Sequence, residues 1–230
     1  MYGGYYYVDS SWFTLLMIAL AISFYAQFKV SSAFNKYLKV PSSSNYTGSE
    51  IARIILDRNG LYDVRVEPIG GNLTDHYDPR HKVIRLSRNV YNGNSIASVS
   101  VAAHEVGHAL QHAEGYFPLI LRNNLAPIVS FSSRFIWILI ILGFAISPFY
   151  LELGIALYFG IVLFQVITLP VEFNASRRAL YQLENGLVYQ SEIESSKKVL
   201  NAAALTYVAA TLVSIAELLR LFALMGRRRD

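Results

Sequence analysis

Two histidines four residues apart, with a glutamate directly after the first, form the strongest chemical pattern in this sequence. The stretch "VAAHEVGHAL" (101–110) places His104, Glu105 and His108 in this order. On an α-helix, residues four apart lie on one face, so both imidazoles can bind one metal ion. Glu105 is rotated by about 100° from the first histidine and can reach a water on the metal without displacing a ligand. This His-Glu-x-x-His spacing predicts a zinc hydrolase site in which Glu105 is the general base.

A catalytic zinc needs a third protein ligand, and the sequence offers several. His112 lies about 80° round the helix from the first histidine, so it faces partly away from the predicted ion. His76 and His81 have no ligand spacing. Glu172, in "LPVEFNASRRAL", is better placed if Pro170 begins a second helix. On the residues alone, Glu172 is equally well explained as an acidic residue stabilised near a helix N-terminus.

The predicted second helix has a face of small residues that can pack closely on the histidine helix. These residues are Ala175, Ser176 and Ala179. On the histidine helix the corresponding small residues are Ala102, Ala103, Gly107 and Ala109.

The composition differs from that of ordinary soluble proteins. Hydrophobic residues make up 53% of the chain and charged residues only 16%, against about 25% charged in soluble domains. The chain has no cysteine, which excludes disulfides and thiolate metal ligands. No long basic run with interleaved aromatic residues is present, so nucleic acid is not expected as a partner.

Long apolar stretches predict about four membrane helices, because each can span much of the roughly 30 Å hydrocarbon core. We expect the first to be a retained anchor rather than a cleaved signal peptide, since residues 1–11 contain no Lys or Arg. The aromatic cluster at 5–12 suits the membrane interface. The last stretch is weaker and either spans the membrane or lies against the bundle. The four stretches are 12–28, 135–150, 151–169 and 202–225.

Between the first two apolar stretches lies a segment of soluble character. Residues 47–61 predict a helix capped by Thr47 and Glu50. Residues 62–69 alternate like a strand, and 70–87 predict a hairpin that turns at Asp78-Pro79. The histidine helix is expected to begin at Asn94 or Ser95 and to end at Gly115.

These elements predict a mainly α membrane protein with a small α+β, zincin-like catalytic region. A short β-hairpin or sheet is expected beside the His-Glu-x-x-His helix. The expected division is an N-terminal anchor, a catalytic region, a membrane hairpin, a third-ligand helix with its connector, and an apolar C-terminal helix with a basic tail. The corresponding ranges are 1–28, 29–130, 131–169, 170–201 and 202–230.

Three stretches give the chain a resemblance to a known family. "HEVGHALQH", "EFNASRRAL" and "FYAQFKVSSAFNKY" resemble the YugP-like neutral zinc metallopeptidases of bacterial membranes, a gluzincin-type group. The resemblance covers nearly the whole chain. It implies one catalytic Zn²⁺ bound by His104, His108 and Glu172, with Glu105 as base. Better-known membrane gluzincins carry an Asp four residues after the ligand Glu, where this chain has Ser176. That Asp's role is expected to pass to Ser176 or Asn174, or to be absent.

Parity and charge predict which side of the membrane holds the site. The histidines precede the hairpin of 135–169 and Glu172 follows it, so both can lie on the same side only if the hairpin crosses the membrane twice or not at all. Positive charge concentrates in 29–134, and Lys29 and Lys36 lie close to the first anchor. The positive-inside rule therefore predicts a cytoplasmic site. The basic tail at 226–230 disagrees with this rule if the last helix spans.

Together these features predict a multi-pass endopeptidase of the bacterial cell membrane that acts on polypeptides at the cytoplasmic surface. The substrate is expected to add a strand beside "HKVIRLS" (81–87). Arg178 and His112 are the first candidates to stabilise the oxyanion, with Arg177 and Tyr181 as further ones. The alternatives are an intramembrane zinc protease and a catalytically inactive zinc-binding scaffold. The run before His104 is too short to span a bilayer, which disfavours the intramembrane alternative. The oligomeric state cannot be inferred.

Overall fold

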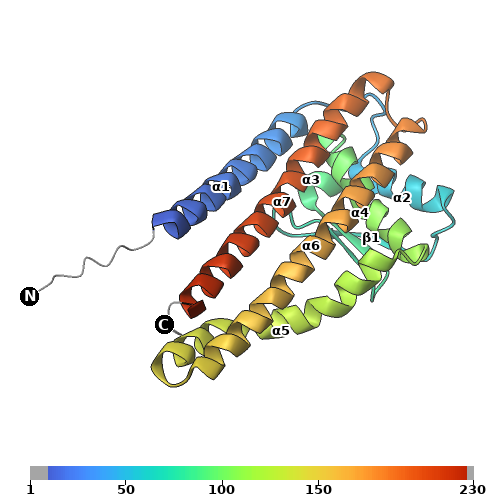
Figure 1. Cartoon of the computed structure of the whole chain (residues 1–230). Helices are drawn as coiled ribbons and strands as arrows, with labels where there is room; N and C mark the ends of the chain where they lie inside the picture. The colour runs from blue at the N-terminus through green and yellow to red at the C-terminus, as the bar shows by residue number, and fades with distance from the viewer. Residues whose placement is uncertain (1–9, 227–230) are drawn as a thin grey trace, which may run out of the picture.

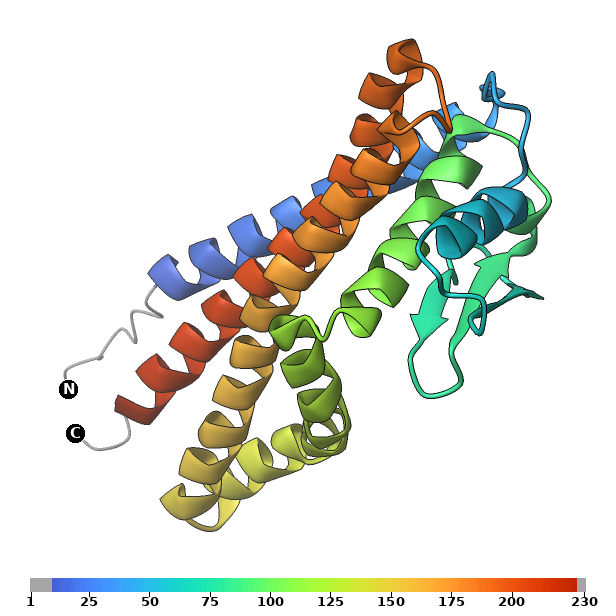
Figure 2. The ribbon, with the colours of Figure 1, turned by 90° about the vertical axis from the view of Figure 1, so that its right-hand side faces the viewer.

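Four long helices stand beside a small domain of short helices and one sheet in the computed structural model, which describes residues 10–226 (Figures 1 and 2). The long helices are α1 (Ser10–Leu38), α5 (Phe117–Ala145), α6 (Pro148–Glu184) and α7 (Gln190–Gly226). The small domain contains α2 (Gly48–Arg58), α3 (Arg88–Tyr91), α4 (Ile96–Ala113) and the strands.

All four long helices are long and apolar enough to cross a membrane. This agrees with the four apolar stretches and includes the last one, which is the least clear in the sequence. The predicted interfacial aromatic cluster at 5–12 falls mostly outside the described residues, as does the basic tail after Gly226.

The long helices form a row in which α1 packs on α7, α7 on α6, and α6 on α5 (Figure 1). The C-terminal ends of α1 and α6 and the N-terminal ends of α5 and α7 lie toward the sheet (Figure 2). The turn between α5 and α6 lies at the opposite end of the row. The chain therefore returns from this hairpin to the end that holds α4, as the parity argument expects.

The caps of α2 and α4 follow the sequence signals. Thr47 and Glu50 make a reciprocal capping box at the start of α2. The Ser95 side chain accepts a hydrogen bond from a backbone N–H in the first turn of α4. Gly115 follows the end of α4 with φ 67°, a conformation that glycine adopts without a steric penalty.

The sheet has three strands in the order β1-β3-β2: β1 (Arg65–Ile69), β2 (His76–Asp78) and β3 (Val83–Ser87). β2 and β3 pair antiparallel, which confirms the predicted hairpin, and β1 pairs parallel to β3. The expectation that a substrate pairs with the edge of 81–87 was wrong, because β3 is paired on both sides. The free edge beside α4 belongs to β2.

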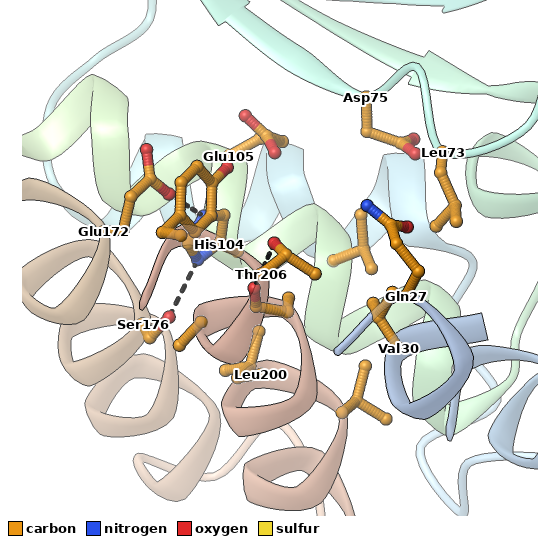
Figure 3. Close-up of a pocket in the computed structure, with 15 residues that line it drawn as sticks. Gln27, Val30, Leu73, Asp75, His104, Glu105, Glu172, Ser176, Leu200 and Thr206 are labelled. Carbon is orange, nitrogen blue, oxygen red and sulfur yellow. Dashed lines mark hydrogen bonds and ion pairs between the residues drawn. The ribbon is translucent and has the colours of Figure 1, made fainter. Parts of the chain in front are cut away.

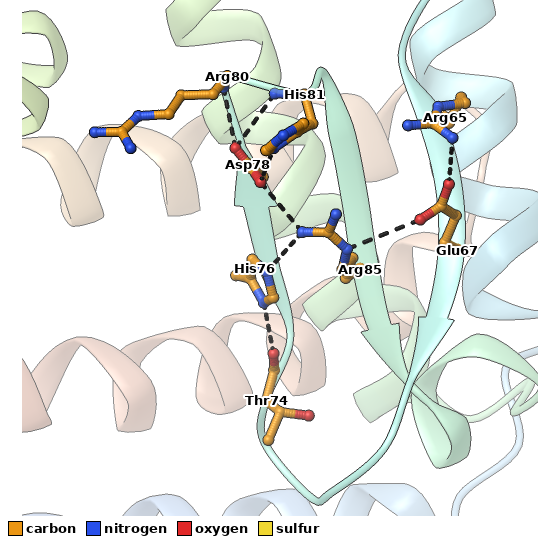
Figure 4. A network of polar contacts seen from close by, with 8 residues as sticks. All are labelled: Arg65, Glu67, Thr74, His76, Asp78, Arg80, His81 and Arg85. Carbon is orange, nitrogen blue, oxygen red and sulfur yellow. Dashed lines mark hydrogen bonds and ion pairs between the residues drawn. The ribbon is translucent and has the colours of Figure 1, made fainter.

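A network of charged side chains ties the three strands together (Figure 4). Arg85 on β3 lies 3.2 Å from Asp78 on β2 and 3.8 Å from Glu67 on β1. Asp78 also accepts a hydrogen bond from His81 at 2.7 Å. Hydrogen bonds from His81 and Arg85 hold the pKa of Asp78 well below its usual range. The network stabilises the hairpin, and it gives His81 a structural role that involves no metal ion.

The contact between α4 and α6 depends on small residues, as expected. A Cβ built on Gly107 would stand 2.6 Å from the backbone oxygen of Ala175, so only glycine allows this approach. Ala175 and Ala179 are fully buried. The two helices can therefore bring side chains from segments far apart in the sequence to one place.

The prediction that Pro170 begins a new helix was wrong, because Pro170 lies inside α6. Proline removes one hydrogen bond from the helix, but burial of Val171, Glu172 and Ala175 against the rest of the fold maintains it. Helix α6 therefore continues without interruption across the expected boundary between residues 169 and 170. The expected boundaries at 28/29 and 130/131 likewise fall inside α1 and α5.

Candidate metal centre

Two histidines of α4 and one glutamate of α6 lie close enough to bind one metal ion. Figure 3 shows two of them, His104 and Glu172, side by side. The candidate ligand atoms of His104, His108 and Glu172 all lie within 4.8 Å of one another. Glu172 Oε2 is 3.3 Å from His104 Nε2 and 3.6 Å from His108 Nε2. Tetrahedral ligands bound at roughly 2.1 Å stand about 3.4 Å apart, so these separations fit a zinc ion. Two imidazole nitrogens and one carboxylate oxygen are also a ligand set of catalytic zinc.

Glu105 lies next to this ligand set and is only 7% exposed. Burial raises its pKa to about 7, and the negative charges of Glu172 and Asp75 add to the rise. His104 and the backbone N–H of Tyr77, which donates to the Glu105 carboxylate, act in the opposite direction. A divalent cation at the ligand set would also favour the carboxylate form. Such a group can take and return a proton at neutral pH.

Ser176 holds the first histidine of the candidate site. Its Oγ lies 3.2 Å from His104 Nδ1, which leaves His104 Nε2 directed at Glu172. Ser176 is one of the two residues that the sequence predicts for this orienting role. Its hydroxyl can orient the imidazole without adding a charge.

A chain of hydrogen bonds determines which ring nitrogen of His108 carries the proton. Arg178 Nε can only donate, so the Asn174 atom 2.7 Å away is Oδ1. Gln111 Nε2 donates to that same Oδ1 at 2.9 Å and to the Val171 carbonyl at 2.8 Å. The Gln111 oxygen therefore faces His108 Nδ1, 3.0 Å away, and accepts its proton. His108 Nε2 is left with a lone pair directed at the candidate metal position.

Replacing Gln111 is expected to weaken zinc binding without unfolding the protein. Gln111→Met keeps the size of this fully buried side chain and removes the acceptor for His108 Nδ1. Loss of such a partner costs roughly 10- to 100-fold in metal affinity. Zinc affinity measured by competition with a chelating dye tests this expectation. Gln182→Met on α6 is the matched control, and equal affinities for both variants would contradict the assigned role of Gln111.

The structure does not bring the expected oxyanion donors to the ligand set. Arg178 makes two hydrogen bonds with Glu114, at 2.6 and 2.7 Å, and lies with Arg177 and Tyr181 around a separate pocket. His112 Nδ1 is 2.8 Å from the Tyr77 hydroxyl, and His112 lines neither of the two cavities that border Glu105. Arg178 therefore stabilises the chain of partners around His108, while His112 supports β2.

Three other side chains reach the candidate site that the sequence does not single out. Arg122, from the start of α5, lies 3.1 Å from Glu172 Oε1. Tyr207 from α7 and Asp75 from the loop before β2 line the cavities on both sides of Glu105. Tyr207 lies within an apolar run and the other two have no motif spacing, so only the fold reveals them. The Tyr207 hydroxyl and the Arg122 guanidinium are hydrogen-bond donors of the kind that can stabilise the oxyanion formed by a peptidase.

Comparisons with known proteins agree with this chemistry. Residues 12–226 match the model of a protein family described as "Putative neutral zinc metallopeptidase". The chain is 54% identical over 218 residues to "Putative membrane protease YugP" of Bacillus subtilis (strain 168). That match covers 94% of this chain and 97% of the relative. No solved structure is significantly similar to this chain.

The family match and the relative both extend over nearly the whole chain, the four long helices included. They cover His104, Glu105, His108 and Glu172 together. The chain therefore belongs to the neutral zinc metallopeptidase family, as the resemblance of its motifs implies.

Proposed function

We propose that this protein is a membrane-anchored, zinc-dependent endopeptidase that hydrolyses polypeptides at the cytoplasmic surface of the bacterial membrane. The observation that carries the proposal is the meeting of His104, His108 and Glu172, with the Glu105 carboxylate beside them. Membership of a zinc metallopeptidase family supports this reaction, and the name of the Bacillus relative, a membrane protease, supports its place at a membrane.

The residues present divide the work of peptide hydrolysis between them. Zinc bound by His104, His108 and Glu172 would supply Lewis-acid polarisation of the scissile carbonyl and of the attacking water. Glu105 takes a proton from that water and later delivers it to the nitrogen of the leaving amine, so that the C–N bond breaks and a carboxylate and an amine result. Tyr207 and Arg122 are our candidates to stabilise the oxyanion.

The location of the ligand set supports action at the membrane surface. Glu172 follows the apolar stretch of α6 that ends at Leu169, which places it about 5 Å further along the helix. α4, which carries both histidines, is not among the four candidate spans found in residues 10–226. This favours a site at the surface over the intramembrane alternative. The presence of every group required for hydrolysis disfavours an inactive scaffold.

Removal of zinc is expected to abolish hydrolysis reversibly. Purified protein in detergent should cleave an unstructured protein such as casein and lose this activity after dialysis against a strong zinc chelator. Adding back zinc should restore it, while adding magnesium should not, since magnesium prefers all-oxygen ligands. Full hydrolysis by metal-free protein would contradict the proposed function.

Single cysteines can test the proposed orientation, because the natural chain contains none. Arg80→Cys lies on the exposed hairpin of the small domain, and Ile146→Cys lies at the turn between α5 and α6. In bacterial cells whose cell wall has been removed and whose cytoplasmic membrane is intact, a membrane-impermeant maleimide should label position 146. It should label position 80 only after the cells are lysed. The reverse pattern would place the site outside the cell.

A further inference from the structure

Two cavities of different chemistry meet at the candidate metal centre. One, of about 250 Å³, lies between α1, α4, α6 and α7 and is mainly apolar (Figure 3). The other, of about 120 Å³, lies between β2, α4 and the start of α5, and its lining is about half polar, so it is more polar than the first. Four residues line both cavities: Asp75, Glu105, Glu172 and Tyr207.

The apolar cavity has a wall of small and aliphatic side chains. Leu200, Ala203 and Tyr207 are three and four residues apart on α7 and so share one face. Val30 of α1 and Val101 of α4 form the opposite wall. The short side chain of Ala203 leaves space that a larger residue would fill.

The polar cavity presents hydrogen-bonding groups instead. Arg122 and Asn123 line it from α5, and His76 and Tyr77 line it from β2. The main-chain N–H of Tyr77 is directed at Glu105 rather than at β3. The outer edge of β2 therefore runs alongside the candidate site, where an extended chain can lie between the two cavities.

Both cavities adjoin the position of a peptide bond held beside Glu105 and Glu172, because both carboxylates line both cavities. The residue on one side of the bond then meets aliphatic walls, and the residue on the other meets Arg122 and Asn123. Burying several methylene groups in the first cavity favours a bulky apolar side chain there. A polar side chain suits the second, because it can hydrogen-bond to the Arg122 and Asn123 side chains and an apolar one cannot.

We infer that this site selects bonds at which a bulky apolar residue is followed or preceded, in one fixed order, by a polar residue. The inference rests on the proposed function and adds its substrate class. α1 and α7, which bound the apolar cavity, are themselves candidate membrane spans. The polypeptides that fit are therefore those with an apolar segment at the membrane and a polar flank, cut where the two meet.

The cut sites in a mixed peptide library test this selectivity. Zinc-loaded protein in detergent is incubated with the library, and mass spectrometry identifies the bonds cleaved. We expect Leu, Ile, Phe or Met on one fixed side and polar residues on the other. Cut sites without this asymmetry would overturn the inference while leaving the proposed peptidase in place. Absence of any cleavage by zinc-loaded protein would contradict the proposed function and this inference with it.

A variant that fills the apolar cavity links the selectivity to this part of the structure. In the wild type, a peptide with Leu on the apolar side should have a kcat/KM at least roughly 10-fold above the same peptide with Ala. Ala203→Phe should reduce this ratio to about 1, because its ring occupies the space. The ratio does not depend on the fraction of active protein.

Leu205→Phe is the matched control. Leu205 lies on the same helix but lines a groove on a different face, with Lys29 and Lys198. This variant should keep the ratio of the wild type. An unchanged ratio in Ala203→Phe would overturn the inference and leave the cavity to another occupant, such as a lipid acyl chain.

Discussion

Glu105→Gln should bind zinc as tightly as the wild type and yet lose peptidase activity. Glutamine keeps the size of this buried side chain and can still accept the hydrogen bond from the Tyr77 N–H, but it cannot take a proton. Loss of a general base lowers rates by roughly 10²- to 10⁴-fold. We therefore expect kcat/KM to fall by about this factor while the zinc content stays the same.

The control for Glu105→Gln is a variant that removes a carboxylate far from the candidate metal centre. Glu194→Gln changes an exposed side chain of α7 that forms an ion pair with Lys197 at 3.7 Å. It should retain the activity of the wild type. Cleavage by Glu105→Gln at the rate of the wild type would mean that another group accepts the proton.

Glu172→Gln should lose both zinc and activity. Glu172 is 2% exposed and is the one carboxylate within contact distance of both His104 and His108 among residues 10–226. Removing a charged ligand is expected to weaken zinc binding by more than the roughly 100-fold caused by loss of an outer partner. Zinc retained after gel filtration, measured per chain, gives the result directly.

Glu184→Gln provides the matched control, because Glu184 ends the same helix and is exposed. It should retain zinc and activity. Together, Glu105→Gln and Glu172→Gln separate two roles that a loss of activity alone does not separate. If Glu172→Gln kept its zinc, the third ligand would have to be a different residue.

The chemistry of α4 could be predicted from the sequence because it is local. Helical periodicity places His104 and His108 on one face, and Ser95 and Gly115 signal the ends of the helix. The four apolar stretches could be predicted for the same reason, since length and composition suffice. The role of Glu172 could not be predicted from local pattern alone. Only the number of membrane crossings between Glu172 and the histidines, and the family resemblance, linked these residues.

What the sequence could not reveal depends on long-range packing. Pro170 is a strong local signal for a helix start, but tertiary contacts carry α6 through it. Arg178 has the charge of an oxyanion donor, yet Glu114 and Asn174 hold it elsewhere. Tyr207 reaches the site only because α7 packs beside α6. The pairing of β1 with β3, which buries the expected substrate edge, is likewise non-local.

Metal analysis of purified protein is the most direct test of the central claim that His104, His108 and Glu172 hold one zinc ion. Wild type, His104→Ala and His112→Ala are loaded with zinc, freed of excess metal and measured per chain. His112 is the natural control, since it lies on the same helix and bonds to Tyr77 instead. We predict one zinc per chain in the wild type and in His112→Ala, and none in His104→Ala. A wild type without stoichiometric zinc, or a His104→Ala variant that keeps it, would contradict the assignment.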